Sequence, residues 1–109
     1  MRAVEILEKV CKLVGGDRNA QHGDILSNGQ NIARLWTAYL QMRQADFVPL
    51  KASEVFDLME LLKVARRQSG RTNMDDYMDG AGYAGCAGEA RFREGEEDAA
   101  NKTVTTLRR

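Results

Sequence analysis

The chain has 109 residues, 43% of them apolar and 29% charged, which indicates one globular domain with a modest hydrophobic core. Sixteen basic residues balance sixteen acidic ones, so no net charge draws the protein to nucleic acid or to an anionic membrane, and we expect neither as a partner. The N-terminus lacks a signal-peptide core and no apolar stretch approaches the ~20 residues that cross a bilayer, so we expect a cytoplasmic protein.

Four amphipathic helices are predicted, because apolar residues recur at three- and four-residue spacing. The first helix spans 2–14, and a polar connector with the only histidine, His22, leads to the second helix, at 24–43. The only proline, Pro49, interrupts the helical pattern before the third helix, at 52–68. The two cysteines lie far apart without metal-ligand spacing, and we expect free thiols.

The second and third helices each have a broad apolar face, which we expect to pack in the core. On the second helix this face comprises Ile25, Ile32, Leu35, Trp36, Tyr39, Leu40 and Met42. On the third helix it comprises Val55, Leu58, Met59, Leu62 and Ala65, widened by Phe56, Leu61 and Val64.

The fourth predicted helix, at 74–93, has four glycines in its interior: Gly80, Gly82, Gly85 and Gly88. Each costs about 1 kcal/mol of helix propensity relative to alanine. This cost predicts close packing of the helix against another helix or a second subunit, and therefore a homo-oligomer. From residue 95 onward the chain is polar, so we expect a single all-α domain at 1–94 and a flexible tail at 95–109.

Carboxylates on the third and fourth helices form the strongest candidate site. Glu54, Asp57 and Glu60 are spaced three residues apart, and Asp76 and Asp79 are spaced likewise. Residues at this spacing lie on one helix face, so antiparallel pairing of the two helices would allow the two sets to face each other. Converging carboxylates repel one another unless a cation lies between them, and Mg²⁺ prefers oxygen ligands. The alternative, which spacing alone leaves open, is a solvated acidic helix face.

Cations and two further side chains complete the candidate site. Lys63 and Arg66 follow the acids and are candidates for binding nucleotide phosphates, although cations near a helix C-terminus are also favourable in themselves. His22 is a candidate substrate contact, with a structural hydrogen bond as the alternative. Tyr83 follows Asp79 by four residues and is a second candidate substrate contact.

A longer set of residues resembles a family of small uncharacterised proteins of tailed phages and prophages. The resemblance covers about residues 17–88 and implies a phage protein that acts in the cytoplasm of an infected or lysogenic bacterial host, without implying an activity. It depends on Asp17-Arg18, His22-Gly23-Asp24, Ile32-Ala33-Arg34-Leu35-Trp36, Leu62-Lys63-Val64-Ala65-Arg66, Asp76, Asp79 and Ala81-Gly82-Tyr83-Ala84.

More distantly, the acidic pattern is similar to that of the all-α nucleoside-triphosphate pyrophosphohydrolases of the MazG and dUTPase-like superfamily. These enzymes bind Mg²⁺ with Glu-x-x-Glu on one helix and Glu-x-x-Asp on the next, and they cut a nucleoside triphosphate to the monophosphate and pyrophosphate. Asp57-x-x-Glu60 and Asp76-x-x-Asp79 correspond to these pairs, with aspartate in place of two glutamates.

The resemblance to these enzymes implies a MazG-like four-helix bundle and an Mg²⁺-dependent pyrophosphohydrolase. Glu60 and Asp79 would be catalytic, and the metal ligands would be Glu54, Asp57, Glu60, Asp76 and Asp79. The competing hypothesis is a non-catalytic phage accessory protein that binds a host protein or sequesters a nucleotide. Whether the chain is an enzyme is left open by the sequence.

Overall fold

The computed structural model describes residues 1–16 and 23–108, with side chains described as far as Lys102. Within these residues the protein is entirely helical and has no strand. Its helices are α1 (Ala3–Gly15), α3 (Ile25–Arg43), α4 (Ala52–Arg66) and α5 (Met74–Arg108). The prediction of an all-α protein with four helices is therefore confirmed for this part of the chain.

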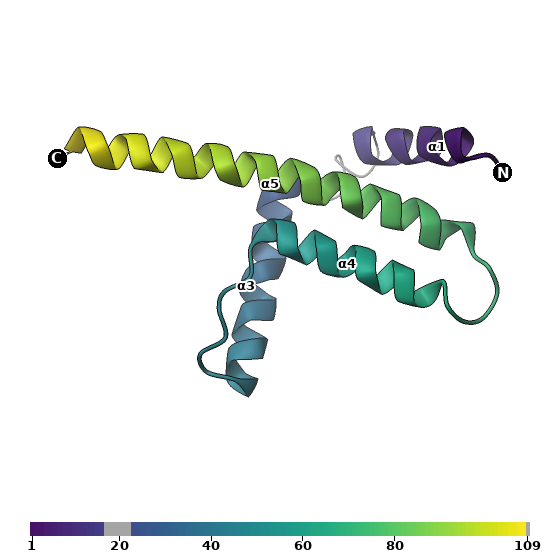
Figure 1. Ribbon diagram of the computed structural model, residues 1–109, viewed down its shortest axis with the longest axis horizontal. Coiled ribbons are helices and arrows are strands. Elements are labelled where there is room, and N and C mark those ends of the chain that lie inside the picture. Colours follow the sequence, from purple (N-terminus) through teal and green to yellow (C-terminus); the bar gives the residue numbers. More distant parts are fainter. Residues whose placement is uncertain (17–22, 109) are drawn as a thin grey trace.

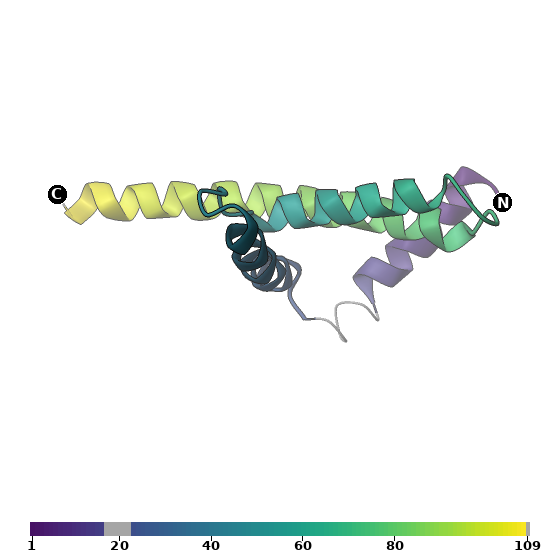
Figure 2. The ribbon, with the colours of Figure 1, turned by 90° about the horizontal axis from the view of Figure 1, so that it is seen from below.

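An antiparallel hairpin of α4 and α5 is the centre of the structure (Figure 1). α1 packs against the N-terminal half of α5, and Figure 2 shows that it runs obliquely to α5. α3 crosses the hairpin near the start of α4 and then projects away from it (Figure 1). Because α3 crosses the hairpin instead of lying along it, the expected four-helix bundle is not confirmed.

Hydrogen bonds from distant parts of the chain define the start of α4. The Ser53 N–H donates to Glu94 Oε1 at 2.9 Å and the Ser53 hydroxyl donates to Glu94 Oε2 at 2.8 Å. Glu54 accepts a further hydrogen bond from the Lys51 N–H at 2.9 Å. Carboxylates near a helix N-terminus satisfy its free N–H groups and favour its dipole. Glu94 lies on α5, so it joins the beginning of α4 to the middle of α5.

The core lies where α3, α4 and α5 meet, and it is small. Its buried cluster comprises Leu26, Ala52, Phe56, Cys86, Ala87 and Ala90. Gly29 lets α3 approach α4 closely, since a Cβ at this position would lie 2.8 Å from both Ala52 Cβ and Phe56 Cε2. Neither cysteine forms a disulfide, as expected; Cys86 is buried and Cys11 is exposed.

The expectation that both broad apolar faces pack in the core is wrong for about half of each face. α3 contacts the hairpin through its buried residues Leu26, Gly29, Ala33 and Thr37. α4 turns Val55 and Phe56 inward. Ile25, Ile32, Trp36, Leu40 and Met59 are half-buried. Seven other large apolar side chains of the two faces are exposed: Leu35, Tyr39, Met42, Leu58, Leu61, Leu62 and Val64. α3 projects from the hairpin and α4 is covered by α5 on one side only, so each helix buries only part of its apolar surface.

The fourth predicted helix extends further than expected. α5 continues to Arg108 instead of ending near residue 93. Residues 96–102 include glutamate, alanine and lysine, which are good helix formers, and Gly95 alone does not interrupt them. The expected tail is therefore helical as far as Arg108, and its flexibility stays a prediction.

The glycines of α5 have different surroundings. A Cβ on Gly80 would collide with the Arg67 guanidinium, and Gly82 is buried. A Cβ on Gly85 or on Gly88 would meet nothing within 4 Å. Close packing within the chain therefore accounts for Gly80 but not for Gly85 and Gly88.

No helix in the described part of the chain is long and apolar enough to cross a membrane.

Candidate functional site

The two predicted aspartates of α5 are held by the two predicted phosphate-binding residues of α4. Lys63 Nζ lies 3.1 Å from Asp79 Oδ2, and Arg66 Nε lies 3.1 Å from Asp76 Oδ1. We call these four residues the α4–α5 seam. The antiparallel hairpin does bring acids and bases of the two helices together, but as ion pairs between the helices.

The two pairs of the seam differ in burial. The Asp76 side chain is 7% exposed, whereas the Asp79 side chain is 41% exposed. Although Arg66 Nε lies close to Asp76 Oδ1, this buried oxygen accepts no well-aligned hydrogen bond from any described residue. The contact between Arg66 and Asp76 is therefore mainly one of opposite charges.

Arg67 closes the end of the seam. Its guanidinium lies over the ring of Tyr77, 4.4 Å from the ring centre, and donates to the Asp76 carbonyl oxygen at 3.3 Å. This side chain occupies the space that the missing side chain of Gly80 leaves open. A cation over an aromatic face is attracted by the ring quadrupole, so Arg67 helps to fasten α4 to the first turns of α5.

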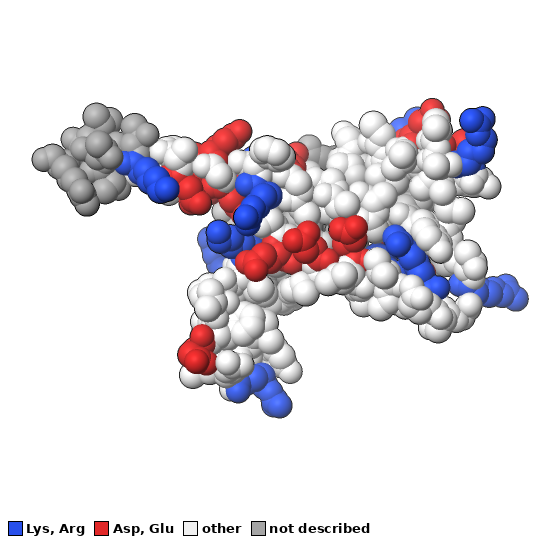
Figure 3. All heavy atoms as spheres, in the orientation of Figure 1, with Lys and Arg blue, Asp and Glu red and all other residues white. Residues whose placement is uncertain are grey.

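The five predicted metal ligands do not converge as one set in this structure. Among the described residues, no group of three or more histidine, cysteine, aspartate or glutamate side chains is arranged to hold a metal ion. Asp76 and Asp79 belong to the seam, whereas Glu54, Asp57 and Glu60 follow one another along α4. In Figure 3 a row of acidic side chains lies over α4 and its boundary with α5, with basic side chains at both ends of the row.

Two of the predicted metal ligands line a hollow of about 470 Å³ between α4 and α5. We call it the acidic hollow, and its lining comprises Ser53, Glu54, Asp57, Ala84, Ala87, Gly88 and Arg91. The small side chains of α5 leave this space open beside the two carboxylates. Among the residues with described side chains, neither Asp57 nor Arg91 forms an ion pair. The hollow thus combines two carboxylates with a guanidinium that is available to an anion.

Arg91 is the site residue that the sequence reasoning missed. It shares a helix face with Ala84 and Gly88, since the three are spaced four and three residues apart. That spacing is readable from the sequence. The face itself could be recognised as part of a site only once the register of α4 on α5 was known.

A second hollow, of about 490 Å³, lies between α3, the connector before α4, and the middle of α5. The sequence did not indicate it. Three of its polar side chains are engaged in the fold: Glu94 accepts from Ser53, Thr37 Oγ1 accepts from the Leu50 N–H at 2.9 Å, and Gln41 donates to the Phe47 carbonyl at 2.9 Å. These three side chains connect neighbouring segments of the fold, and the hollow is also lined by Gln30, Arg34, Lys51, Glu97 and Asp98.

The other predicted site residues are placed as follows. Tyr83 packs against the core cluster. Glu60 is half-buried on α4, three residues from Asp57 and three from Lys63. His22 lies outside the described residues. The roles of these residues in substrate binding or catalysis stay predictions.

Comparison with known proteins points to phage proteins. Residues 5–91 match the family model described as "Domain of unknown function (DUF6378)". The chain is 37% identical over 81 residues to the Gene 55 protein of Mycobacterium phage D29, covering 74% of this chain and 50% of the relative. It is 34% identical over 93 residues to the Gene 55 protein of Mycobacterium phage L5, covering 85% of this chain and 56% of the relative.

The chain thus spans about half the length of these two relatives. No solved structure matches it. The expected resemblance to phage proteins is confirmed, whereas the likeness to the MazG hydrolases stays a prediction. Because the family model covers most of the chain, the protein belongs to the family described as domain of unknown function DUF6378.

Proposed function

We propose that the protein is an Mg²⁺-dependent nucleoside triphosphate pyrophosphohydrolase whose substrate phosphates bind at the acidic hollow. The observation that supports this proposal is the grouping of Glu54, Asp57 and Arg91 around one open volume. The proposal differs from the expectation based on sequence in its metal ligands. Asp76 and Asp79 are already neutralised by cations of α4, so we assign the metal to the carboxylates of α4.

The residues present fit a hard divalent cation. Asp57 is exposed and forms no ion pair with a described residue. One carboxylate oxygen of Glu54 accepts a hydrogen bond from the Lys51 N–H, and the second oxygen remains for a ligand. Mg²⁺ is commonly bound by only one or two carboxylates, with water and substrate phosphates completing its coordination. When bound, the metal would polarise a phosphoryl oxygen and lower the barrier to attack by water.

The remaining roles fall to residues of both helices. Arg91 would bind a phosphate with its guanidinium, which presents a fork of donors suited to phosphate oxygens. Glu60 lies one turn along α4 from Asp57, and it would accept the proton of the attacking water. Lys63, three residues beyond Glu60, would remain with Asp79 and stabilise the hairpin.

Pyrophosphate release from a panel of canonical and modified nucleoside triphosphates tests the proposal. We expect the wild type to release pyrophosphate with Mg²⁺ and not with EDTA. We expect Asp57→Asn to reduce the rate by about 100-fold or more, because the loss of a metal-binding charge removes transition-state stabilisation. Asp46→Asn is the matched control, since Asp46 is exposed in the connector between α3 and α4, outside the hollow.

Three results would contradict parts of the proposal. Activity that survives Asp57→Asn but is lost in a folded Asp79→Asn variant would move the metal to the seam. Activity in EDTA would exclude the metal. Absence of release from every nucleotide by the folded wild type would exclude the hydrolase, and would favour a non-catalytic accessory protein that binds a host protein or sequesters a nucleotide.

A further inference from the structure

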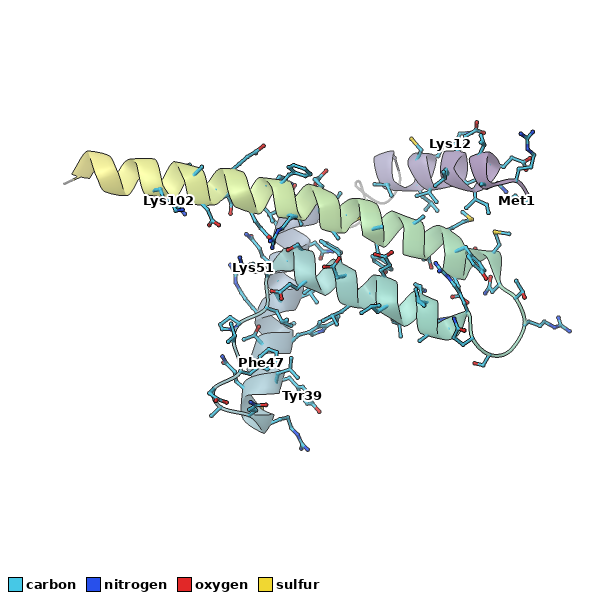
Figure 4. All side chains as sticks on the ribbon, in the orientation of Figure 1. Met1, Lys12, Tyr39, Phe47, Lys51 and Lys102 are labelled. Atoms are coloured by element: carbon cyan, nitrogen blue, oxygen red, sulfur yellow. The ribbon has the colours of Figure 1, made fainter. Side chains whose placement is uncertain are left out.

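Two exposed apolar faces meet in the angle between α3 and α4. Six large side chains form this surface, which we call the α3–α4 corner: Leu35, Tyr39, Met42, Leu58, Leu61 and Leu62. Met42 is 84% exposed and Leu61 is 61% exposed. In Figure 4 Tyr39 extends from α3 on the side of the open angle beneath α4. Several large apolar side chains exposed on two neighbouring helices, on a chain with a small core, indicate an interaction site.

The chain as a whole exposes more area than a compact monomer of its mass. A compact monomer of 12.2 kDa would expose about 6,100 Å². This chain exposes 8134 Å², an excess of about 2,000 Å² over that monomer. Its radius of gyration is 16.7 Å, against about 13 Å for a compact domain of this length. Obligate homodimers bury roughly 2,000–5,000 Å² in total over both partners, which is of the same order as the excess of two such chains.

We propose that a second copy of this chain packs on the α3–α4 corner, with the two α4 helices antiparallel about a twofold axis near Leu61. A twofold contact uses the same patch on both copies, so the patch must be complementary to itself. The corner satisfies this condition, because its six members are apolar. Two copies of the chain also carry no net charge that would drive them apart.

Charges at the two ends of α4 determine the antiparallel direction. Glu54 lies in the first turn of α4 and Arg66 in its last turn. Both are spaced six residues from position 60, so an antiparallel partner centred near this position brings the end of α4 that carries Glu54 beside the end that carries Arg66 in the other copy. Arg66 is suited to this contact, since its side chain is 56% exposed and only its Nε lies near Asp76. A parallel arrangement would instead place like charges together.

The same arrangement covers the apolar face of α3. α3 projects beside the beginning of α4, and an antiparallel partner places the end of its own α4 there (Figure 1). Leu35, Tyr39 and Met42 of each copy then pack beside Leu62 and Ala65 of the other. The pairing does not depend on the proposed hydrolysis. It does bring Arg66 of the second copy toward Glu54 at the edge of the acidic hollow, so in the dimer Asp57 would be the main carboxylate left for the metal of the proposed function.

Measurements on the wild type alone test the pairing first. Sedimentation equilibrium should give a mass of twice 12.2 kDa at concentrations of about 100 µM, with dissociation on dilution. The melting temperature should rise with protein concentration, because dimerisation stabilises the folded chain by mass action. A monomer at every concentration would overturn the proposal and leave the corner to a different partner protein.

Variants at the axis test the arrangement. Leu61→Lys and Leu61→Glu should each weaken dimerisation by about 100-fold or more, because each places two like charges together in an apolar contact. An equal mixture of the two variants should form the mixed dimer at least about 10-fold more tightly than either variant alone forms its own dimer. This rescue distinguishes a broken interface from a chain that does not fold.

Phe92→Lys is the matched control, because Phe92 is large, apolar and 79% exposed on α5. Position 92 lies two residues from buried Ala90, so it is turned to the opposite side of α5 from the hairpin contact. This variant should dimerise as the wild type does. A dimer that is lost in Phe92→Lys but retained in both Leu61 variants would overturn the proposed interface, as would a mixture that shows no rescue.

Discussion

Arg93 of α5 binds the carboxylate of Asp24 with both terminal nitrogens, at 2.7 Å to Oδ1 and 3.2 Å to Oδ2. Asp24 is the N-cap of α3, and its Oδ2 also accepts from the Ser27 N–H at 3.0 Å. One carboxylate thus accepts a hydrogen bond from a free N–H group at the start of α3 and also joins α3 to α5, because Arg93 lies 69 residues later in the chain. The hydrogen bond from Arg93, followed by that from the Ser27 N–H, lowers the pKa of Asp24 from 3.8 to about 2.

This pKa shift predicts a dependence of stability on pH. Folding lowers the pKa of Asp24, so its interaction with Arg93 stabilises the folded state above pH 3.8 and loses this effect as the pH falls from 3.8 towards 2. Asp24→Asn should therefore lower the melting temperature at neutral pH, with a difference from the wild type that shrinks as the pH falls from 3.8 through 2 and disappears below pH 2. A difference that persists unchanged to pH 2 would contradict the assignment, and Asp46→Asn serves as the exposed control.

The seam should be unequally sensitive to the loss of its two cations. Arg66→Met leaves the buried Asp76 carboxylate without its cation, and we expect the free energy of unfolding to fall by about 1–2 kcal/mol. This value is below that of a fully buried pair, because the Arg66 side chain is 56% exposed. Lys63→Met should cost less than about 1 kcal/mol, since water can solvate Asp79. Urea denaturation measures the loss in the free energy of unfolding for both variants. A larger loss for Lys63→Met than for Arg66→Met would contradict the role of burial.

Glycine substitutions should have opposite effects on α3 and α5. Gly29→Ala places a Cβ 2.8 Å from Phe56 and Ala52, and we expect a loss of about 1–3 kcal/mol from overpacking. Gly85→Ala and Gly88→Ala place a Cβ in open space, so each should raise stability by up to about 1 kcal/mol through helix propensity. Thermal melting measures all three. Destabilisation by either α5 variant would indicate that a partner packs closely on this face.

The hydrogen bonds from Ser53 to Glu94 should contribute to the stability of the start of α4. Glu94→Ala removes an acceptor that serves both the N–H and the hydroxyl of buried Ser53. We expect a loss of about 1–2 kcal/mol in the free energy of unfolding, as for a deleted N-cap. Glu97→Ala is the matched control, because Glu97 is exposed one turn further along α5. Equal effects of the two variants in chemical denaturation would show that helix charge, and not the cap, is responsible.

Local pattern was sufficient for the helices themselves. The apolar periodicity and Pro49 are readable within a few residues, and they predicted helices at nearly the bounds that the structure has for α1, α3 and α4. The short connector between the third and fourth predicted helices likewise allowed their antiparallel pairing. The end of α5 was missed because polar composition alone does not distinguish a solvated helix from a tail.

The partner of each charged or apolar face was decided only by the tertiary structure. Spacing of three residues places Glu54, Asp57 and Glu60 along one helix, but it does not say which groups of another helix lie opposite. The register of α4 on α5 placed Lys63 and Arg66 against Asp79 and Asp76, and it opened the acidic hollow beside Arg91. The sequence by itself therefore determined the helices, because they depend on neighbouring residues. The site depended on contacts between residues distant in the chain, which periodicity does not contain.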